Sequence, residues 1–105
     1  MISLSPKTKK LLNAVFPEKL RTQASLVIEH ECANNLPFCE KNNMYQLERI
    51  RFAVLKLSAG NLEKLTEAVN IAKVDWRDVL VAAGFGYSTT AHEEWAAGIL
   101  LIRIF

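Results

Sequence analysis

Residues 47–86 read LERIRFAVLKLSAGNLEKLTEAVNIAKVDWRDVLVAAGFG, and this stretch has the clearest helix boundaries and the densest apolar periodicity in the chain. The pattern predicts three helices joined by two tight turns. The first helix begins slightly upstream, at about Met44, and runs to Ser58 with apolar residues recurring along one face. Gly60 then stands where a glycine commonly ends a helix in the left-handed conformation.

Asn61 and Asp75 are N-cap residues that predict the other two helices of this stretch. The helix after Asn61 runs to about Lys73, and the shorter one after Asp75 is stopped by Gly84. The short helix is apolar nearly all round, and helices of that kind belong in protein interiors. We therefore expect it in the middle of the bundle.

Two prolines mark the helices upstream of this stretch. Ser5 and Pro6 form an N-cap followed by proline at the first helical position, which predicts a short amphipathic helix. Pro17 ends that helix and opens a second one that runs to about Ala33. Residues 34–43 carry four asparagines and a proline without any period, which predicts a loop.

The C-terminal helix is predicted by Thr90 and Glu93, which fit the capping-box pattern. Its end is apolar on every side, and soluble monomers rarely expose such a patch. The tail must therefore either pack back onto its own chain or contact a second copy in a homo-oligomer. The residues of this predicted interface are Trp95, Ile99, Leu100, Leu101, Ile104 and Phe105.

Length and composition fit one globular domain. The chain has 105 residues, of which 50% are hydrophobic and 23% are charged, so it is long and apolar enough to build a core. The expected fold class is all-α, a compact orthogonal bundle of five or six short helices in a single domain over residues 1–105. The net charge of +2 is too small to indicate a nucleic-acid or membrane partner by itself.

The chain lacks sequence signals for export or membrane insertion. The opening MISLSPKTKK has no apolar core of the length found in signal peptides, and the apolar run AAGILLI near the end is too short to span a bilayer. Two cysteines without an export signal indicate reduced thiols. We therefore expect a cytoplasmic protein without a membrane partner.

The residues that could bind a metal do not form a site. His30, Cys32 and Cys39 have a spacing that suggests zinc, but residues two apart on a helix point about 200° from each other. His92 lacks the second histidine of a zinc-protease motif, and we interpret it as a first-turn helix residue beside two glutamates, which suit the positive end of the helix dipole. The sequence predicts no metal and no cofactor, with Cys32 in the core and His30 in solvent.

Patterns for catalysis are missing as well. The sequence has no nucleophile-elbow motif and only two histidines. The glycines at 84 and 86 follow a helix, whereas a phosphate-binding loop opens one. We therefore expect no catalysis.

Two charged residues fall on apolar helix faces. Glu31 projects into the stripe of the second helix, and Arg51 projects into that of the third. A charge buried alone is costly, so we expect Arg51 to form a buried ion pair with Glu31 or with Asp78. The alternative is that both charges reach water at helix ends or edges.

Residues 1–21 are basic, with five cationic residues against one glutamate, a net charge of +4. Phosphate contact through this region is the alternative function, that of a nucleic-acid-associated regulator. A helix-turn-helix interpretation of 62–83 is not supported, because its second helix offers one arginine beside an aspartate and is otherwise apolar. The cationic residues are Lys7, Lys9, Lys10, Lys19 and Arg21.

The segments LERIRFA (47–53), LSAGNL (57–62) and DWRDVLVAAGFG (75–86) together resemble a type of small uncharacterised bacterial all-helical protein. NLPFCE at 35–40 fits the same pattern. The resemblance covers residues 30–95 and implies a bacterial, cytoplasmic origin, with no activity to transfer. From the residues we expect a small protein-interaction or adaptor protein that acts through its surface on an unknown protein partner.

Overall fold

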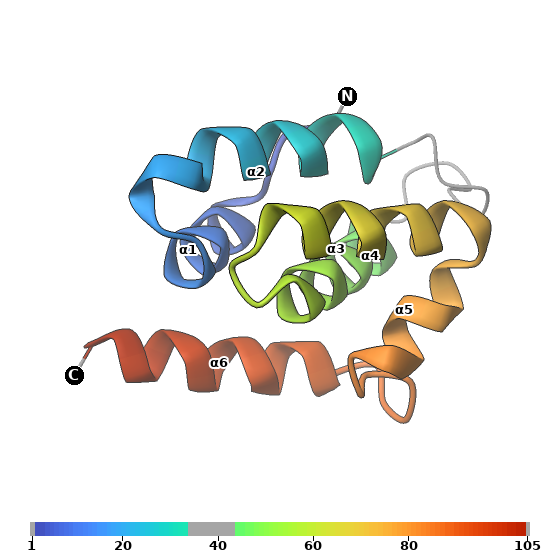
Figure 1. The fold of residues 1–105 in the computed structure, drawn as a ribbon. Helices are drawn as coiled ribbons and strands as arrows, with labels where there is room; N and C mark the ends of the chain where they lie inside the picture. Colours follow the sequence, from blue (N-terminus) through green and yellow to red (C-terminus); the bar gives the residue numbers. More distant parts are fainter. Residues whose placement is uncertain (1, 34–43, 105) are drawn as a thin grey trace.

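Six α-helices make up the part of the chain that the structure describes (Figure 1). The structure is a computed structural model and describes residues 2–33 and 44–104, with 102–104 described by their backbone alone. No strand occurs in these ranges, so the predicted all-α class is confirmed. The helices are α1 (Pro6–Val15), α2 (Glu18–Glu31), α3 (Met44–Ser58), α4 (Leu62–Val74), α5 (Trp76–Ala82) and α6 (Ala91–Ile104).

The helix starts follow the predicted caps. Three N-cap side chains accept hydrogen bonds of 2.9–3.1 Å from backbone N–H groups of the first turn. These N-caps are Ser5, Asn61 and Asp75. At the start of α6, the Thr90 carbonyl accepts from the amides of Glu93 and Glu94, and the Thr90 amide donates to Ser88 Oγ at 3.2 Å.

Gly60 and Gly84 adopt the left-handed conformation after α3 and α5, with φ values of +80° and +81°. A Cβ atom on Gly60 would lie 2.7 Å from the carbonyl oxygen of Val15, so the end of α1 packs directly against this turn. A Cβ atom on Gly84 would have Lys56 Nζ as its nearest neighbour, 3.8 Å away. Backbone conformation favours glycine at both positions, but close packing demands it only at Gly60.

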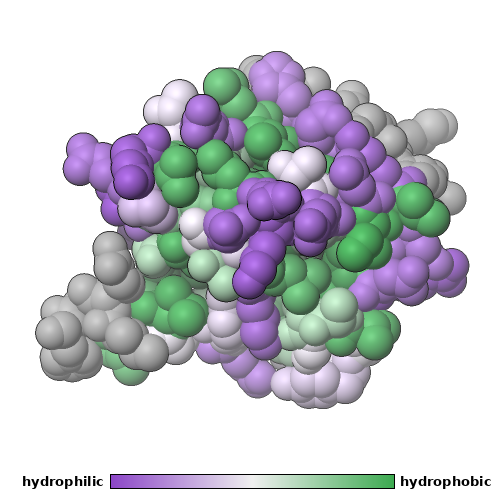
Figure 2. All heavy atoms as spheres, in the orientation of Figure 1, coloured by the Kyte–Doolittle hydropathy of each residue, from purple (hydrophilic) through white to green (hydrophobic). Residues whose placement is uncertain are grey.

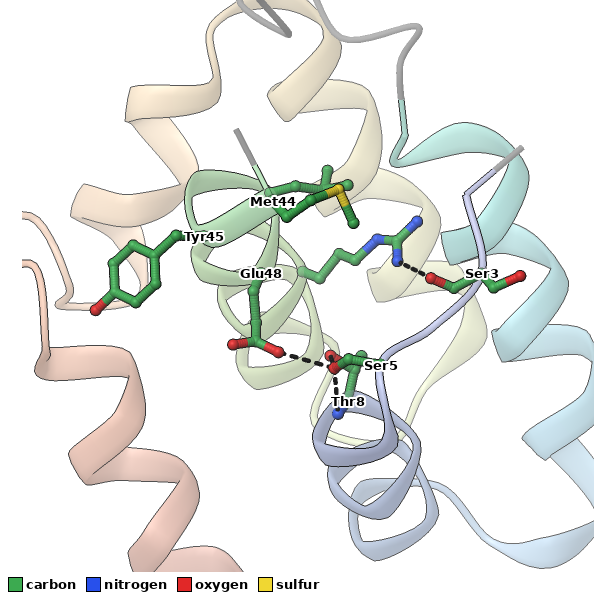
Figure 3. Close-up of a pocket in the computed structure, with 8 residues that line it drawn as sticks. Ser3, Ser5, Thr8, Met44, Tyr45 and Glu48 are labelled. Atoms are coloured by element: carbon green, nitrogen blue, oxygen red, sulfur yellow. Dashed lines mark hydrogen bonds between the residues drawn. The ribbon is translucent and has the colours of Figure 1, made fainter. Parts of the chain in front are cut away.

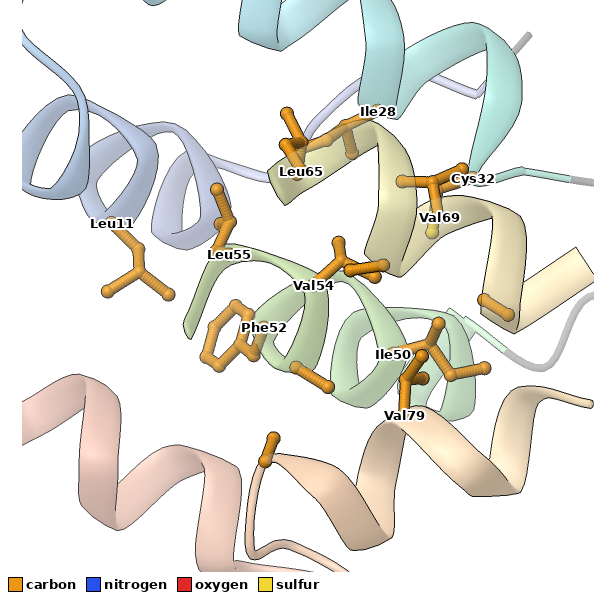
Figure 4. Packing of buried hydrophobic residues seen from close by; sticks show 14 of the residues in the cluster. Leu11, Ile28, Cys32, Ile50, Phe52, Val54, Leu55, Leu65, Val69 and Val79 are labelled. Atoms are coloured by element: carbon orange, nitrogen blue, oxygen red, sulfur yellow. The ribbon is translucent and has the colours of Figure 1, made fainter. Parts of the chain in front are cut away.

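The helix at the centre of the bundle is α3. In Figure 1, α2 lies along one side of the α3–α4 pair and α6 along the opposite side, while α5 closes one end. Nine of the 15 residues of α3 are buried. Figure 4 shows side chains of the other helices meeting those of α3 in the core. Among them are Leu11 of α1, Ile28 of α2, Leu65 and Val69 of α4, and Val79 of α5.

The prediction that the short helix, α5, lies in the middle of the bundle is wrong. Val79 and Leu80 are buried, but Val81 is 70% exposed. The helix has only seven residues, and one of its faces packs on α3 and α4. The centre is occupied by α3, whose two arginines are buried because backbone carbonyls receive their hydrogen bonds.

Some expectations fall outside the described residues. They concern the predicted loop at 34–43, which contains Cys39, and the terminal Phe105. Within the ranges that are described, none of the helices is both long and apolar enough to cross a membrane.

Candidate functional site

Arg51 of α3 forms hydrogen bonds with two other segments of the chain, the N-terminal residues and the residue after α2. Its Nε donates to the Cys32 carbonyl at 2.9 Å, Nη1 to the Ser3 carbonyl at 3.0 Å and Nη2 to the Ile2 carbonyl at 2.6 Å. The residue is only 2% exposed. Because Cys32 follows the last turn of α2, the guanidinium also lies at the negative end of that helix dipole. We call Arg51 and these three carbonyls the Arg51 cluster.

The predicted partners of Arg51 lie elsewhere. The Glu31 carboxylate forms an ion pair with Lys73 of α4, and its side chain is 51% exposed. The hydrogen bond and the charge of Lys73 lower the pKa of Glu31. Asp78 is exposed on the first turn of α5. The expected ion pair of Arg51 with Glu31 or Asp78 is therefore wrong, because backbone carbonyl oxygens receive the hydrogen bonds of the guanidinium. The position of a residue on a helix face does not show which backbone carbonyls lie near it.

Arg49 lies on another face of α3 and also donates hydrogen bonds to backbone carbonyls, in this case those of the connection between α5 and α6. Its Nη2 donates to the carbonyls of Phe85 and Ser88 at 3.2 and 3.4 Å, and Nη1 donates to Gln46 Oε1 at 3.0 Å. Arg49 is 8% exposed. Among the described residues, its Nε has no hydrogen-bond partner.

Two further side chains of α3 hold the same connection. The Tyr45 hydroxyl donates to the Thr89 carbonyl at 2.7 Å, and Lys56 Nζ donates to the Ala83 carbonyl at 2.7 Å. The Lys56 ammonium also lies 5.1 Å from the centre of the Phe85 ring. The backbone between α5 and α6 is thus held by three side chains of one helix.

His92 is buried beside this connection, in the first turn of α6. It is 0% exposed, and its ring meets those of Tyr45, Phe52 and Phe85 edge-on, with centroids 5.4, 5.2 and 6.4 Å away. Neither ring nitrogen has a hydrogen-bond partner among the described residues. We call His92, these three aromatic residues and Arg49 the His92 cluster.

Burial lowers the pKa of His92 from its ordinary value of 6.5. The carboxylates of Glu93 and Glu48 raise this pKa, while the charges of Arg49 and Lys7 lower it further. An imidazolium on aromatic faces recovers about 0.5–2 kcal/mol, less than the several kcal/mol that burying an ion costs. The buried imidazole is therefore neutral at pH 7.

His92 lies in the first turn of α6 as expected, but the sequence analysis did not predict that its side chain is buried. The sequence contained a usable signal, because His92, Trp95 and Ile99 recur at i, i+3 and i+7 and so share one helix face. Trp95 and Ile99 both pack against the core, and that face carries His92 inward with them.

A pocket of about 260 Å³ lies between the start of α1 and α3 (Figure 3). Ser5 Oγ donates to Glu48 Oε1 at 2.8 Å across it, and Arg51 forms part of the inner wall. The pocket therefore offers the Glu48 carboxylate, hydroxyl groups and the Arg51 side chain beside the apolar residues Met44 and Leu47. Its lining residues are Ser3, Ser5, Thr8, Met44, Tyr45, Leu47, Glu48 and Arg51.

A second, wider hollow of about 340 Å³ lies between α4 and α5, and we call it the α4–α5 groove. Three large apolar side chains on these two helices are exposed: Ile71 by 45%, Val74 by 83% and Val81 by 70%. Figure 2 shows hydrophobic atoms interspersed with hydrophilic ones on the face where α4 lies in front. The residues that line the groove are Leu57, Lys64, Glu67, Ala68, Ile71 and Ala82.

The predicted C-terminal interface divides into two parts. Trp95 and Ile99 are half-buried against the core of their own chain, and the Trp95 ring lies 5.8 Å from that of Phe85. Leu100 is half-buried and Leu101 is 56% exposed, while the side chain of Ile104 lies outside the described part. Of the two alternatives for the tail, packing back onto its own chain holds for Trp95 and Ile99.

The basic N-terminal residues also divide into two groups. Arg21 donates to the carbonyls of Phe16 and Asn13 at 3.1 and 2.9 Å, so its charge covers the C-terminal end of α1. The other four, which we call the lysine face, are exposed to solvent. They are Lys7, Lys9, Lys10 and Lys19.

His30 of α2 and Cys32, which follows that helix, lie as predicted, with Cys32 buried and His30 exposed. Over residues 2–33 and 44–104, no three His, Cys, Asp or Glu residues are grouped so that they could hold a metal ion. No protein-family model, curated protein or solved structure matches the chain.

Proposed function

We propose that this protein is a protein-interaction module that binds an amphipathic helix of a partner protein in the α4–α5 groove. The observation that supports this proposal is the apolar part of the groove's lining, which consists of Leu57, Ala68, Ile71 and Ala82 and in which the large side chain of Ile71 is 45% exposed. Exposed apolar side chains gathered at one place mark sites for other molecules more often than scattered ones do.

The chemistry of the groove specifies the partner. Ala68 and Ala82 are small, so the backbone of a bound helix can approach α4 and α5 closely. Lys64 and Glu67 lie on its rim, three residues apart on α4. A complementary helix has apolar residues at i, i+3 or i+4 and i+7, with an acidic and a basic residue flanking them.

Charge substitutions at the rim test this proposal. Ile71→Glu and Ala82→Glu place a carboxylate in the groove, and both positions are exposed, so folding changes by no more than about 0.5 kcal/mol. Asn70→Glu is the matched control, since it adds the same charge to an exposed position of the same helix. Proteins that co-purify from the native host with the wild type and with Asn70→Glu are compared with those that co-purify with the two test variants.

Any protein that the test variants lose is then purified, and its affinity is measured by calorimetry. A loss of at least about tenfold in affinity for Ile71→Glu, with Asn70→Glu equal to wild type, supports the groove. Equal binding by all four proteins would place the partner elsewhere.

A second candidate function is contact with nucleic acid through the lysine face. Its four lysines are exposed, and none of them forms an ion pair with another described residue. If all four neutralise phosphates, the logarithm of the affinity for duplex DNA falls with the logarithm of salt concentration with a slope of roughly −3 to −4. Fluorescence anisotropy between 50 and 200 mM salt measures that slope, and affinity independent of salt would exclude this function.

The bacterial and cytoplasmic origin and the self-association of the C-terminal tail stay predictions of the sequence. The exposure of Leu101 supports self-association, because an apolar side chain that is 56% exposed is available to a second copy. The packing of Trp95 and Ile99 on their own core limits such an interface to the last turns of α6.

A further inference from the structure

We propose that a proton controls the docking of α6: the helix stays on α3 while His92 is neutral, and it separates from α3 when the imidazole is protonated. The geometry of the His92 cluster supports this proposal. The imidazole is 0% exposed, lies among three aromatic rings, and has no hydrogen-bond partner for either nitrogen among the described residues. A cation in this position has no neutralising contact, so it gains most by moving into water.

The arrangement of the helices indicates which element would move. α6 lies at the edge of the bundle and packs mainly on α1 and α3 (Figure 1). Among the side chains of α6 that the structure describes, those of Ala91, His92 and Ala96 are buried, and Trp95 and Ile99 lie at the border of this face. The largest fully buried apolar side chains of the described residues belong to segments before α6, among them Leu11, Ile28 and Phe52 (Figure 4). Separation of α6 is therefore less costly than unfolding of the whole domain.

The connection before α6 provides a fixed point for such a movement. Arg49, Tyr45 and Lys56 hold the backbone of residues 83–89 to α3 through hydrogen bonds to carbonyl oxygens. These bonds do not involve α6 itself. The helix can thus leave α3 while its N-terminal connection remains attached.

Four charged groups act on the imidazole, from each helix packed around it. Glu93 of α6 and Glu48 of α3 favour the imidazolium, whereas Arg49 of α3 and Lys7 of α1 oppose it. The Tyr45 hydroxyl is occupied, since it donates to the Thr89 carbonyl at 2.7 Å. Burial, which lowers the pKa of His92, is the largest of these influences on its protonation.

The direction of the pH dependence follows from linkage. Burial lowers the pKa of His92 in the docked state below its ordinary value of 6.5, so the separated state binds the proton more tightly. The docked state of α6 is therefore most stable above pH 6.5, and its stability decreases as the pH falls below this value. The opening equilibrium constant should rise about tenfold for each pH unit, until docked His92 itself begins to titrate.

The test measures α6 and the rest of the domain separately in the full chain. Amide hydrogen exchange between pH 5 and 7.5 gives protection factors, corrected for the intrinsic rate, for α6 and for α4. In a Trp76→Phe background, Trp95 is the single tryptophan and its fluorescence reports solvent exposure of α6. We expect protection in α6 to fall about tenfold per pH unit below 6.5 with a red shift of Trp95, while α4 stays protected.

His92→Phe keeps an aromatic ring in the cluster and should abolish this pH dependence, whereas His30→Gln on the exposed face of α2 should leave it unchanged. If His92→Phe does not fold, the His92 resonance of the wild type is followed by NMR during the same titration. Titration of His92 together with loss of α6 protection supports the proposal. Titration while α6 stays protected, or simultaneous loss of protection in α4 and α6, would overturn it.

Discussion

Two arginines two residues apart on α3 bind backbone carbonyls in opposite directions and with different completeness. In the Arg51 cluster, Nε, Nη1 and Nη2 all donate, at 2.6–3.0 Å, to carbonyls of the N-terminal segment and of the end of α2. In the His92 cluster, Arg49 makes longer bonds of 3.2 and 3.4 Å to carbonyls, its Nε has no partner among the described residues, and neither does either nitrogen of His92.

The difference shows how one residue type can serve two purposes. Buried polar groups that are all hydrogen-bonded specify one arrangement, because any movement leaves several of them unpaired. Buried polar groups that lack partners lose no hydrogen bonds when the surrounding elements separate, and they gain contact with water. The Arg51 cluster therefore fixes the N-terminal half, whereas His92, whose ring nitrogens have no partner among the described residues, marks the contact at which we propose that α6 separates.

The largest expected effect comes from Arg51→Met. The substitution removes three hydrogen bonds from a charged donor and leaves buried carbonyls without partners, so we expect the free energy of unfolding to fall by about 3–5 kcal/mol in urea titrations. Arg51→Lys should recover only part of this loss, since an ammonium cannot reproduce the fork of the guanidinium. A loss below about 1 kcal/mol for Arg51→Met would mean that the cluster does not fix this half.

Gly60→Ala should have the next largest effect, with Gly84→Ala as its comparison. Both alanines would be strained at φ near +80°, at a cost of about 1–2 kcal/mol. At Gly60 the methyl group would also lie 2.7 Å from the Val15 carbonyl, so we expect a total loss of about 2–4 kcal/mol in the free energy of unfolding. Equal losses at the two glycines would show that α1 adjusts without cost.

Arg49→Met should cost less than Arg51→Met. Its carbonyl contacts are longer and the residue is 8% exposed, so water can replace part of the lost hydrogen bonding, and we expect about 1–2 kcal/mol. Hydrogen exchange should then quicken in residues 85–90 but not in the segment around Ser3. The double variant with Arg51→Met should be additive, and strong coupling would contradict a separation of the two clusters.

Gly98→Ala should give the smallest change, and a favourable one. Apart from the chain neighbours and the backbone of α6 itself, no atom of the described residues lies within 4 Å of a Cβ at this position, so the methyl group fits and should stabilise the helix by about 0.5–1 kcal/mol through its higher helix propensity. The melting temperature should rise slightly and α6 should become better protected against exchange. Lower protection of α6 would show that its docking requires the glycine.

The candidate sites were only partly visible in the sequence. The lysine face follows from counting charges, and the apolar tail follows from hydropathy, although its first residues cover their own core. The α4–α5 groove was not expected, because α5 was placed in the interior and its exposed Val81 was read as core. The buried position of His92 was missed although its spacing with Trp95 and Ile99 indicated it.

The sequence by itself determined where the helices begin and end. Ser5, Asn61 and Asp75 cap helices through hydrogen bonds to amides two or three residues away, and Gly60 and Gly84 end helices through their own backbone conformation. Such interactions lie within a single turn of chain. They operate before any helix meets another, so local patterns suffice to predict them.

Only the tertiary structure decided which charges are buried and which helix is central. Arg51 is satisfied by the carbonyl of Ile2, 49 residues away, and His92 of α6 lies against Tyr45 and Phe52 of α3. The periodicity of a helix shows that one face is covered but not which segment covers it. Every residue has a backbone carbonyl whatever its side chain, so the sequence does not indicate which carbonyls bind Arg51 and Arg49.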